Sequence, residues 1–329
     1  MSNILVTGGA GFIGSNLCDY FVKKGHNVTC LDNFSTGHKA NIQHLINYHK
    51  ERFHLIEGDI RDLHTCQRAT KGVDFVFHEA ALGSIPRSID NPILTNEVNI
   101  GGFLNMIVAA RDCGVRRFIF ATSSSIYGDN TDLPKKENSI GKLLSPYALT
   151  KYVDELYADI FSKLYGLEYI GLRYFNVYGE RQDPNSAYAA VIPLFIKQCL
   201  TGECPIINGD GSYSRDFTYI DNAIKMNVLA METENRCAVN QIYNTACGEQ
   251  TTIRDLIALI KEELGKRQLL SKNMKENYGP VRKGDIAHSQ ASIEKAKKYL
   301  SYEPQVFIRE GISKTIDWFI FDEKHSDNR

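Results

Sequence analysis

The sequence lacks both a long apolar run and an excess of charge of either sign. No stretch approaches the roughly 20 apolar residues that a membrane-spanning helix needs, and the N-terminus begins as a strand without the regions of a signal peptide. The 38 basic and 39 acidic residues nearly cancel, so no broad basic surface for nucleic acid or anionic lipid is expected. These absences predict a cytoplasmic protein with no nucleic-acid or membrane partner.

The sequence also lacks the paired spacings that mark zinc sites and redox couples. Its eight cysteines are scattered without a CxxC pair, and its nine histidines form no HExxH pair, so we expect reduced, mostly buried thiols and no metal site. The composition, with 43% hydrophobic and 23% charged residues, is that of a folded globular protein and excludes disordered, collagen-like and disulfide-scaffold classes.

Short apolar runs alternate with helical patterns through the first half of the chain. Five such runs are expected to be strands: Asn3–Thr7, Asn27–Leu31, Phe53–Glu57, Phe75–His78 and Arg117–Thr122. Segments with a period near 3.6 residues separate them, which is typical of βαβ units. Strands joined by crossover helices pair in parallel and are covered on both faces, so the pattern predicts an α/β fold with a doubly wound parallel sheet.

The composition and the hydrophobic pattern of the sequence change after about Asn176. Loops rich in Gly, Pro and Asn appear at 179–186 and 208–214, and the helical and strand patterns become shorter. At 329 residues the chain exceeds the usual size of one domain. We therefore expect a larger unit over residues 1–176, to which later segments return, and a smaller α/β lobe over 177–329.

A glycine-rich turn follows the first strand. Glycines at 8, 11 and 14 open the next helix, and such a turn lets backbone N–H groups approach a pyrophosphate at the positive end of the helix. Asp32 ends the second strand, where a carboxylate accepts hydrogen bonds from ribose hydroxyls and repels a 2′-phosphate. The next residue is Asn33 and not an arginine, so the pattern favours NAD over NADP.

Two further strand ends carry residues suited to the same ligand. Asp59 and Ile60 follow the third strand, and Ala80 and Ala81 follow the fourth. In an open α/β sheet a cofactor lies across the carboxyl ends of the strands. An Asp at a strand end is more often a turn or cap residue, so each of these positions alone is a weak indication.

Tyr147 and Lys151 form a YxxxK pattern on a predicted helix, 147–165. Residues four apart share one helix face, so the ammonium can stabilise the phenolate form of the tyrosine. The chain holds a second copy, Tyr20 and Lys24, where we expect only packing and a solvated lysine. The pattern at 147 differs because a serine cluster, 123–125, ends the fifth strand before it, where a hydroxyl can hold a substrate oxygen and relay its proton.

These motifs occur in one fixed order. TGGAGFIG at 7–14, DNFSTG at 32–37, SSSIYG at 123–128, YALTK at 147–151 and LRYFNVYG at 172–179 together resemble the extended short-chain dehydrogenase/reductases, specifically the NAD-dependent nucleotide-sugar epimerase/dehydratase family. The resemblance covers essentially the whole chain and implies a Rossmann sheet that binds NAD over 1–176 and a lobe that binds mainly UDP-sugar over 177–329.

The resemblance also implies roles for individual residues. The catalytic set is Ser123, Tyr147 and Lys151. The residues implied to contact a tightly bound NAD are Gly8, Gly11, Phe12, Ile13, Asp32, Asn33, Ser35, Gly37, Asp59, Ile60, Ala80, Ala81, Asn99, Tyr147, Lys151 and Tyr174. The residues implied to contact the nucleotide sugar are Ser84, Arg87, Ser123, Ser124, Ser125, Asn176, Arg215, Arg282, Asp285 and Ser289. Among these, Arg215 with Arg282 and Asp285 would hold the pyrophosphate and the uridine ribose.

Within the family the segments 78–88 and 284–292 look most like UDP-N-acetylglucosamine 4-epimerases of bacterial polysaccharide pathways. Ser289 falls where relatives specific for non-acetylated sugars carry a tyrosine, and a small residue leaves room for a 2-acetamido group. Glu79 departs from the family, because many relatives have an uncharged residue there. We expect it either to perturb NAD affinity or to cap a turn.

The implied reaction is reversible inversion at C4 of UDP-N-acetylhexosamines through a 4-keto sugar, with NAD regenerated in each cycle. The alternatives are a 4-epimerase of the corresponding N-acetylated uronates, for which Arg87 could meet a carboxylate, or of UDP-glucose and UDP-galactose. A dehydratase or a decarboxylase is less expected, because Ser124 and Ser125 stand where those relatives carry acids. A non-catalytic NAD sensor is the remaining alternative.

Two helices carry more apolar surface than one sheet face covers. The predicted helix 103–113 and the helix 147–165 both show broad apolar faces, the second through Leu149, Leu156, Ile160 and Leu164. We therefore expect a homodimer formed through a helix bundle. Core packing of these faces is the competing explanation.

Overall fold

A seven-stranded parallel sheet forms the centre of the computed structural model, which describes residues 1–186, 188–270, 274–281 and 286–326. The strand order is β11-β6-β5-β4-β1-β2-β3. The strands are β1 (Asn3–Thr7), β2 (Asn27–Asp32), β3 (Phe53–Glu57), β4 (Phe75–His78), β5 (Arg117–Ser123), β6 (Glu168–Tyr174) and β11 (Gln241–Thr245). The five strands expected from the sequence all occur, and two of them extend one residue further. The α/β doubly wound fold is thereby confirmed.

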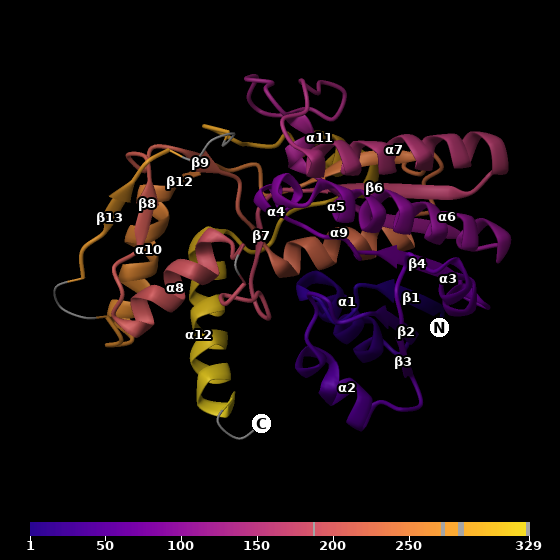
Figure 1. Cartoon of the computed structure of the whole chain (residues 1–329), viewed down its shortest axis with the longest axis horizontal. Coiled ribbons are helices and arrows are strands. Elements are labelled where there is room, and N and C mark those ends of the chain that lie inside the picture. The colour runs from indigo at the N-terminus through magenta and orange to yellow at the C-terminus, as the bar shows by residue number, and fades with distance from the viewer. Residues whose placement is uncertain (187, 271–273, 282–285, 327–329) are drawn as a thin grey trace.

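Helices cover both faces of this sheet (Figure 1). One face is covered by α3 (Leu63–Thr70), α6 (Gly102–Asp112) and α7 (Pro146–Tyr165), and the other by α1 (Phe12–Lys23) and α9 (Ile220–Glu232). Phe103 and Met106 of α6 lie with Phe118 and Phe120 of β5 in one buried cluster, whereas Leu17 and Phe21 of α1 belong to a second cluster on the opposite face. Burial on both faces explains the continuous apolar strands.

A second group of elements stands beside the carboxyl edge of the sheet, at the left of Figure 1. Its helices are α8 (Val191–Thr201), α10 (Ile253–Lys266) and α12 (Ile308–Ser326). Its strands form three pairs: β7 (Val177–Tyr178) with β10 (Thr218–Tyr219), β9 (Ser214–Arg215) with β12 (Thr251–Thr252), and β8 (Ile206–Asn208) with β13 (Asn277–Gly279). The chain then returns to the sheet, where α11 (Glu294–Leu300) lies against β11.

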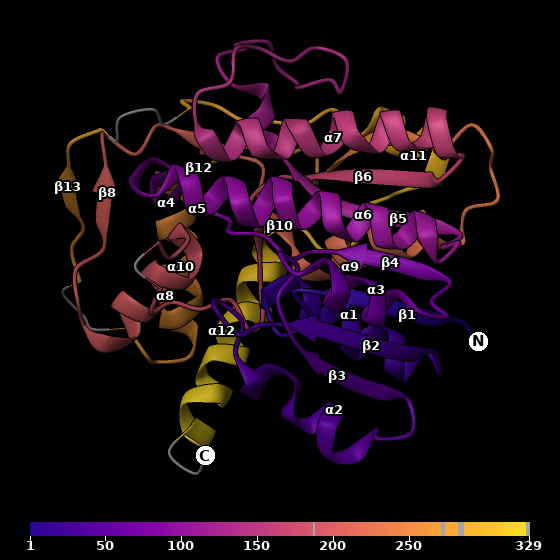
Figure 2. The same cartoon turned by 45° about the vertical axis from the view of Figure 1, so that its right-hand side comes forward.

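Shorter helical segments complete the described chain. They are η1 (Lys39–Ile42), α2 (Gln43–Tyr48), α4 (Ile85–Asp90), α5 (Pro92–Asn96), η2 (Glu97–Gly101) and η3 (Ser124–Tyr127). In the rotated view of Figure 2, α5 and α6 run in line beside α7. Joined through η2 they form one helical run, Pro92–Asp112, with the length and the mean hydropathy, 1.2, of a membrane span.

That run differs from the expectation that no such stretch exists. The difference arises because three consecutive segments join end to end, although none alone has the length of a span. Within the fold 44% of its apolar window is buried, and α6 contacts both α3 and α7. The run therefore forms part of the helical layer on one face of the sheet.

Candidate active site

The register of the sheet brings the predicted site residues to one edge. Thr7 at the end of β1 pairs with both Leu31 of β2 and His78 of β4, and Ser123 of β5 pairs with Tyr174 of β6. The sheet order reverses at β1, and ligands of doubly wound folds bind beside the strand ends at such a point. A cleft of about 800 Å³ opens there.

The cleft gathers 22 of the predicted residues from both halves of the chain. At the end near β1 to β3 they are Gly8, Gly11, Phe12, Ile13, Asp32, Asn33, Ser35, Asp59 and Ile60. Toward β4 to β6 they are Ala80, Ala81, Ser84, Arg87, Ser123, Ser124, Ser125, Tyr147, Lys151, Tyr174 and Asn176. Arg215 and Ser289 come from the second group of elements. Arg282 and Asp285 lie outside the described residues.

The glycine turn is built for close approach of backbone. Gly8 has a φ of +66°, and a Cβ on it would come within 2.8 Å of the backbone N of Ala80, so a larger residue is excluded at this position. A Cβ on Gly14 would overlap the carbonyl oxygen of Gly8. The turn therefore lets the N-terminus of α1 face the cleft, where its first N–H groups lack acceptors within the helix and attract an anion.

The side chain of Asp32 holds two segments of the cleft wall together near the N-terminus of α1. Its Oδ2 accepts from the N–H of Ala10 at 2.9 Å and its Oδ1 accepts from the N–H of Phe34 at 2.8 Å. The carboxylate thereby joins the glycine turn to the chain after β2, and its side chain still lines the cleft. A helix N-terminus and a fixed carboxylate in one cleft fit the diphosphate and ribose of a dinucleotide.

Asp59 carries a second negative charge into the same end of the cleft. Its hydrogen bond with Arg61, at 2.7 Å, lowers the pKa of the carboxyl to about 2. The side-chain amide of Asn33 also donates to it, at 2.9 Å. The carboxylate is thus ionised throughout the neutral range and has a fixed orientation.

Two predicted cofactor residues do not line the cleft but support its wall. A Cβ on Gly37 would come within 2.9 Å of Asp32 Oδ2, so this glycine lets the chain pass close to the carboxylate. The buried side chain of Asn99 accepts from the N–H of Leu82 at 2.8 Å and donates to Thr150 Oγ1 at 3.1 Å. Asn99 thereby fastens the loop after β4 to α7.

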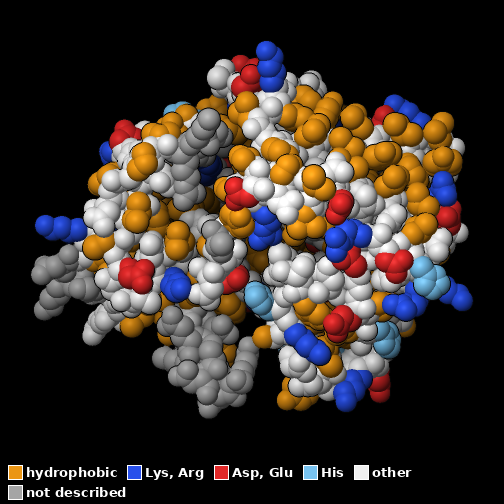
Figure 3. Space-filling model, in the orientation of Figure 1, with side chains coloured by type: hydrophobic (Ala, Val, Ile, Leu, Met, Phe, Trp, Pro, Cys, Tyr) orange, Lys and Arg blue, Asp and Glu red, His pale blue; other side chains and the backbone are white. Residues whose placement is uncertain are grey.

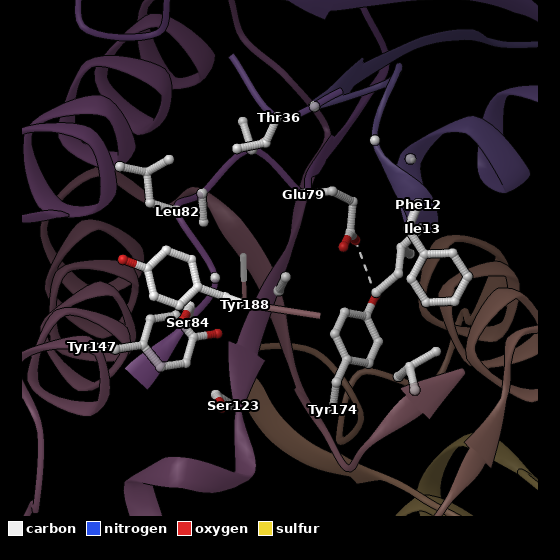
Figure 4. Close-up of a pocket in the computed structure, with 18 of the residues that line it drawn as sticks. Phe12, Ile13, Thr36, Glu79, Leu82, Ser84, Ser123, Tyr147, Tyr174 and Tyr188 are labelled. Atoms are coloured by element: carbon white, nitrogen blue, oxygen red, sulfur yellow. Dashed lines mark hydrogen bonds between the residues drawn. The ribbon is translucent and has the colours of Figure 1, made fainter. Parts of the chain in front are cut away.

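The three residues of the predicted catalytic set come from β5 and the first turns of α7. Ser145 caps α7 by accepting from the N–H of Ala148 at 3.1 Å, and Pro146 takes the first helical position. Figure 4 shows Tyr147, Ser84 and Tyr188 gathered on one side of the pocket, with Ser123 on the strand end below. The second YxxxK copy does not line the cleft, and its Lys24 ammonium lies 5.5 Å from the centre of the Tyr20 ring.

Serine hydroxyls and the Lys151 side chain line this part of the cleft. Ser123 Oγ accepts from the N–H of Ser125 at 3.1 Å and from its hydroxyl at 3.0 Å. Lys151 Nζ donates to the carbonyl oxygen of Ala121 at 3.0 Å. A tyrosine hydroxyl, a lysine and a serine around one space can hold a substrate hydroxyl and move its proton.

The buried side of α7 is charged, which the sequence pattern did not predict. Glu155 accepts from Thr122 Oγ1 at 2.8 Å and from the Arg173 guanidinium at 2.9 and 2.7 Å. Asp154 is fully buried beside Lys151. Glu155 faces the core because it is paired with Arg173 of β6, and Asp154 because it is paired with Lys151 on the same helix. A search for apolar periodicity cannot detect such pairs.

Glu79 occupies the other side of the pocket from Tyr147 (Figure 4). It accepts from the Tyr174 hydroxyl at 2.9 Å, and Tyr174 in turn accepts from the amide of Asn227 at 2.7 Å. Burial raises the pKa of Glu79 to about 7, although Tyr174 and Lys151 oppose this. The residue that departs from the family pattern is thus a cleft carboxyl and not a turn cap.

This raised pKa has a consequence for stability. The folded protein holds a proton on Glu79 that the unfolded chain releases near pH 4.5, so wild-type stability falls between about pH 4.5 and 7. We expect Glu79→Gln to leave the free energy of unfolding nearly unchanged at pH 4 and to raise it at pH 8 by about 3 kcal/mol. Urea unfolding at both pH values measures this. Glu51→Gln, at an exposed position, is the control, and equal gains at both pH values would contradict the assignment.

The second group of elements closes the cleft at the predicted sugar end. Arg87 of α4 lies over the ring of Tyr188 at 5.1 Å, and Tyr188 donates to Asp90 at 2.9 Å. Arg215 donates to the carbonyl oxygens of Ser214 and Ala287 at 2.8 and 3.2 Å. Tyr188 was missed by the sequence analysis, because its loop has no periodicity that would place it.

Asp216 positions this wall. It is fully buried and accepts from the N–H groups of Cys247, Gly248 and Ala291 at 2.9, 3.0 and 3.1 Å. The contact joins three segments that are far apart in the chain. Ser289 lies next to the last of them, 8% exposed, and its N–H donates to the carbonyl oxygen of Ser214 at 3.1 Å.

Residues 4–246 match the NAD dependent epimerase/dehydratase family. The chain belongs to this family. A solved UDP-N-acetylglucosamine 4-epimerase from Methanobrevibacter ruminantium, in complex with UDP-N-acetylmuramic acid, is 39% identical, with 98% and 99% of the two chains covered and a TM-score of 0.90. The UDP-glucose 4-epimerase of Thermotoga maritima, with UDP-glucose, is 37% identical over 98% and 99%, with a TM-score of 0.89. The family and the NAD cofactor predicted from the sequence are confirmed.

A third relative binds a charged sugar. The UDP-glucuronic acid 4-epimerase from Bacillus cereus, in complex with UDP-glucuronic acid and NAD, is 30% identical over 97% and 99% of the two chains, with a TM-score of 0.87. Members of this epimerase/dehydratase family with similar folds thus act on an acetylated, a neutral and an acidic sugar nucleotide. The fold alone does not select among them.

Proposed function

We propose that this protein is a UDP-N-acetylglucosamine 4-epimerase, which interconverts UDP-GlcNAc and UDP-GalNAc. The observation that carries the choice of sugar is Ser289, a small buried side chain on the wall of the cleft. A serine leaves space where a bulky residue would meet a 2-acetamido group. The 39% identical relative acts on the same acetylated sugar, which supports the proposal.

In the proposed reaction Tyr147 removes the proton of the sugar 4-hydroxyl, directly or through Ser123. Lys151 favours the phenolate form of Tyr147, and Ser123 holds the reacting oxygen in place. Gly8, Gly11 and Asp32 would hold NAD in the cleft, and the cofactor would supply reversible hydride transfer at C4 of the sugar. Tyr147 then gives the proton back, so the reaction has no net redox change and needs no second substrate.

In the proposed binding mode the diphosphate and uridine are bound tightly, whereas the sugar is bound loosely. Arg215 and the segment 282–285 would hold the diphosphate and uridine, because guanidinium groups bind phosphates strongly. Small side chains line the cleft where the sugar would lie in this mode: Ser84, Ser124, Ser125 and Ser289. A 4-keto sugar could therefore turn about its diphosphate before it is reduced. In this mode residues 1–176 bind mainly NAD, and residues 177–329 bind mainly UDP-sugar.

A second candidate function is 4-epimerisation of the N-acetylated uronates, and Arg87 favours it. Its guanidinium lines the cleft over the Tyr188 ring, and a stacked guanidinium retains N–H groups for a carboxylate. Elimination or decarboxylation has less support, since Ser124 and Ser125 place hydroxyls and not acids beside Ser123. A non-catalytic sensor is disfavoured, because all three predicted catalytic residues line one cleft.

The deciding experiment follows the anomeric proton signals of UDP-GlcNAc by NMR with purified protein and no added NAD. We expect UDP-GalNAc to form, and the same final ratio to be reached from either sugar. Turnover of UDP-GlcNAcA alone would replace this function with the uronate epimerase, and turnover of UDP-Gal alone with the non-acetylated one. Bound NAD without turnover of any of these sugars would favour the sensor.

We also propose a homodimer formed through α6 and α7. The outer face of α7 exposes Leu149, Leu156, Ile160 and Leu164 by 49, 46, 46 and 68%, and Figure 3 shows hydrophobic side chains gathered over this region. Exposed apolar patches of this kind mark interaction surfaces. Light scattering is expected to give twice the mass of one chain, and Leu156→Asp with Ile160→Asp to give one chain. A monomeric wild type would contradict the proposal.

The cytoplasm is the compartment that we propose. All eight cysteines are free thiols, five of them buried, which suits a reducing environment.

A further inference from the structure

A pair of opposite charges is buried on α7, the helix that begins beside Tyr147. Asp154 follows Lys151 by three residues on α7, and its Oδ2 accepts from Lys151 Nζ at 3.3 Å. The two side chains are 2% and 0% exposed. Removing two charges from water carries a large desolvation penalty, so this buried pair is not explained by its contribution to stability.

The contact fixes where the ammonium points. An ammonium group has three N–H donors. The carbonyl oxygen of Ala121 on β5 accepts one at 3.0 Å, and Asp154 accepts another. Over the described part of the chain no acceptor is found for the third, which remains for the cleft that Lys151 lines. Two different elements thus hold the lysine head in one orientation.

Other charged and titratable groups surround the pair, but each is otherwise engaged. Glu155 on the same helix is neutralised by the Arg173 guanidinium. His78 from β4 is uncharged, because burial and Lys151 lower its pKa to about 3. Glu79, at the end of β4, bonds to Tyr174 of β6. Of the acidic groups in the described chain, Asp154 is the one within ion-pair distance of Lys151.

The carboxyl of Asp154 is only half satisfied. Its Oδ1 is buried and has no hydrogen-bond partner in the described structure, and buried polar atoms without partners are rare in native proteins. Burial raises the pKa of Asp154 to about 7, while the nearby Lys151 acts in the opposite direction, so the carboxylate form that pairs with Lys151 predominates above this pH. Apolar side chains in place of a buried ion pair often leave stability unchanged or increase it. Stabilisation of the fold therefore does not account for the pair.

We propose, on the basis of the function proposed above, that Asp154 is a positioning residue for the reaction. Its carboxylate holds the Lys151 ammonium toward the cleft and offsets part of its positive charge, and it thereby sets the pH at which Tyr147 becomes a base. An uncompensated ammonium would favour the phenolate too strongly, and a phenolate that is stable at low pH is a weaker acceptor of the substrate proton.

The test uses full-length protein with its bound NAD and the variant Asp154→Asn. Asparagine keeps the size and an acceptor oxygen but removes the negative charge, so Tyr147 should ionise about one pH unit lower, as expected when an opposing charge beside its cationic partner is lost. Ultraviolet difference absorbance of the phenolate follows this step, and Tyr147→Phe identifies the signal. The acid limb of kcat/KM should move to lower pH by the same amount.

The same helix offers a matched control. Asp159 pairs with Lys163 at 2.6 Å, and these side chains are 45% and 71% exposed. Asp159→Asn removes the same charge from α7 far from the cleft, so it should leave the Tyr147 titration unchanged. An unmoved titration in Asp154→Asn, or one moved to higher pH because Lys151 has lost its proton, would overturn the proposal.

Two further outcomes are decisive. If Asp154→Asn does not fold, Asp154→Ser is titrated in its place, and failure of both variants to fold would assign the residue a purely structural role. The absorbance titration needs no sugar substrate. A shifted titration without turnover of UDP-GlcNAc would therefore reject the proposed function and keep this proposal, and turnover with an unshifted titration would do the reverse.

Discussion

Replacement of Tyr147 by phenylalanine is expected to lower kcat for 4-epimerisation by about three orders of magnitude, which is within the range of a lost general acid–base group. The hydroxyl is the group that accepts and returns the 4-hydroxyl proton, whereas the ring and its backbone stay in place at the start of α7. KM for UDP-GlcNAc should change less than threefold. Initial rates by NMR, together with the NAD content of the purified variant, measure both effects.

The second YxxxK copy provides the control for this substitution. Tyr20→Phe removes a hydroxyl from the same spacing pattern, on α1 and outside the cleft. It should leave kcat within a factor of two, roughly the spread among neutral substitutions. A Tyr147→Phe variant that keeps a tenth or more of wild-type kcat would show that another group moves the proton, and Ser123 would be the next residue to test.

The sheet could be predicted from the sequence because its strands are buried on both faces. All four residues of β4 and six of the seven in β5 are buried, so each strand appears in the sequence as a short apolar run, Phe75–Phe77 and Phe118–Ala121, between helical patterns. The glycine turn could be predicted for a related reason. The close approach of backbone in this turn requires glycines at a fixed spacing, so the spacing of glycines in the sequence indicates the backbone geometry.

The second group of elements could not be predicted in the same way. β7, β9, β10 and β12 are each two residues long, too short to show the alternation that identifies a strand. The wall that carries Ser289 is held by Asp216, whose three backbone partners lie 31 to 75 residues away in sequence. A single aspartate in the sequence gives no sign of such partners.

The apolar stripe of α7 occurs where the sequence predicts it, but part of it is exposed and not buried. The structure places Leu149, Leu156, Ile160 and Leu164 of that stripe outward. The inward face carries Lys151, Asp154 and Glu155 beside the apolar Ala148, Ala158 and Phe161. An amphipathic helix normally buries its apolar side. This one buries Lys151, which lines the cleft, together with the paired Asp154 and Glu155, and it leaves its exposed apolar side for the proposed partner subunit.

Replacement of Ser289 by tyrosine is expected to lower kcat/KM for UDP-GlcNAc by at least about a hundredfold, because steric exclusion of even small groups discriminates by factors of ten to two hundred. The backbone at this position cannot retreat, since its N–H is bonded to Ser214 and the next segment is bonded to Asp216. The added ring would therefore fill the cleft. UDP-Gal, which has only a hydroxyl at C2, should keep its kcat/KM within about threefold.

The comparison of the two sugars in one variant separates a steric effect from general damage. A misfolded wall would lower turnover of both substrates together, whereas a filled pocket affects only the acetylated one. Ser289→Ala is the matched control, because it removes the hydroxyl without adding volume and should leave both values of kcat/KM within twofold. Unchanged UDP-GlcNAc kinetics in Ser289→Tyr would mean that the acetamido group lies elsewhere in the cleft. Arg87 and Tyr188, on the wall formed by α4 and the loop before α8, would then become the residues that select the sugar.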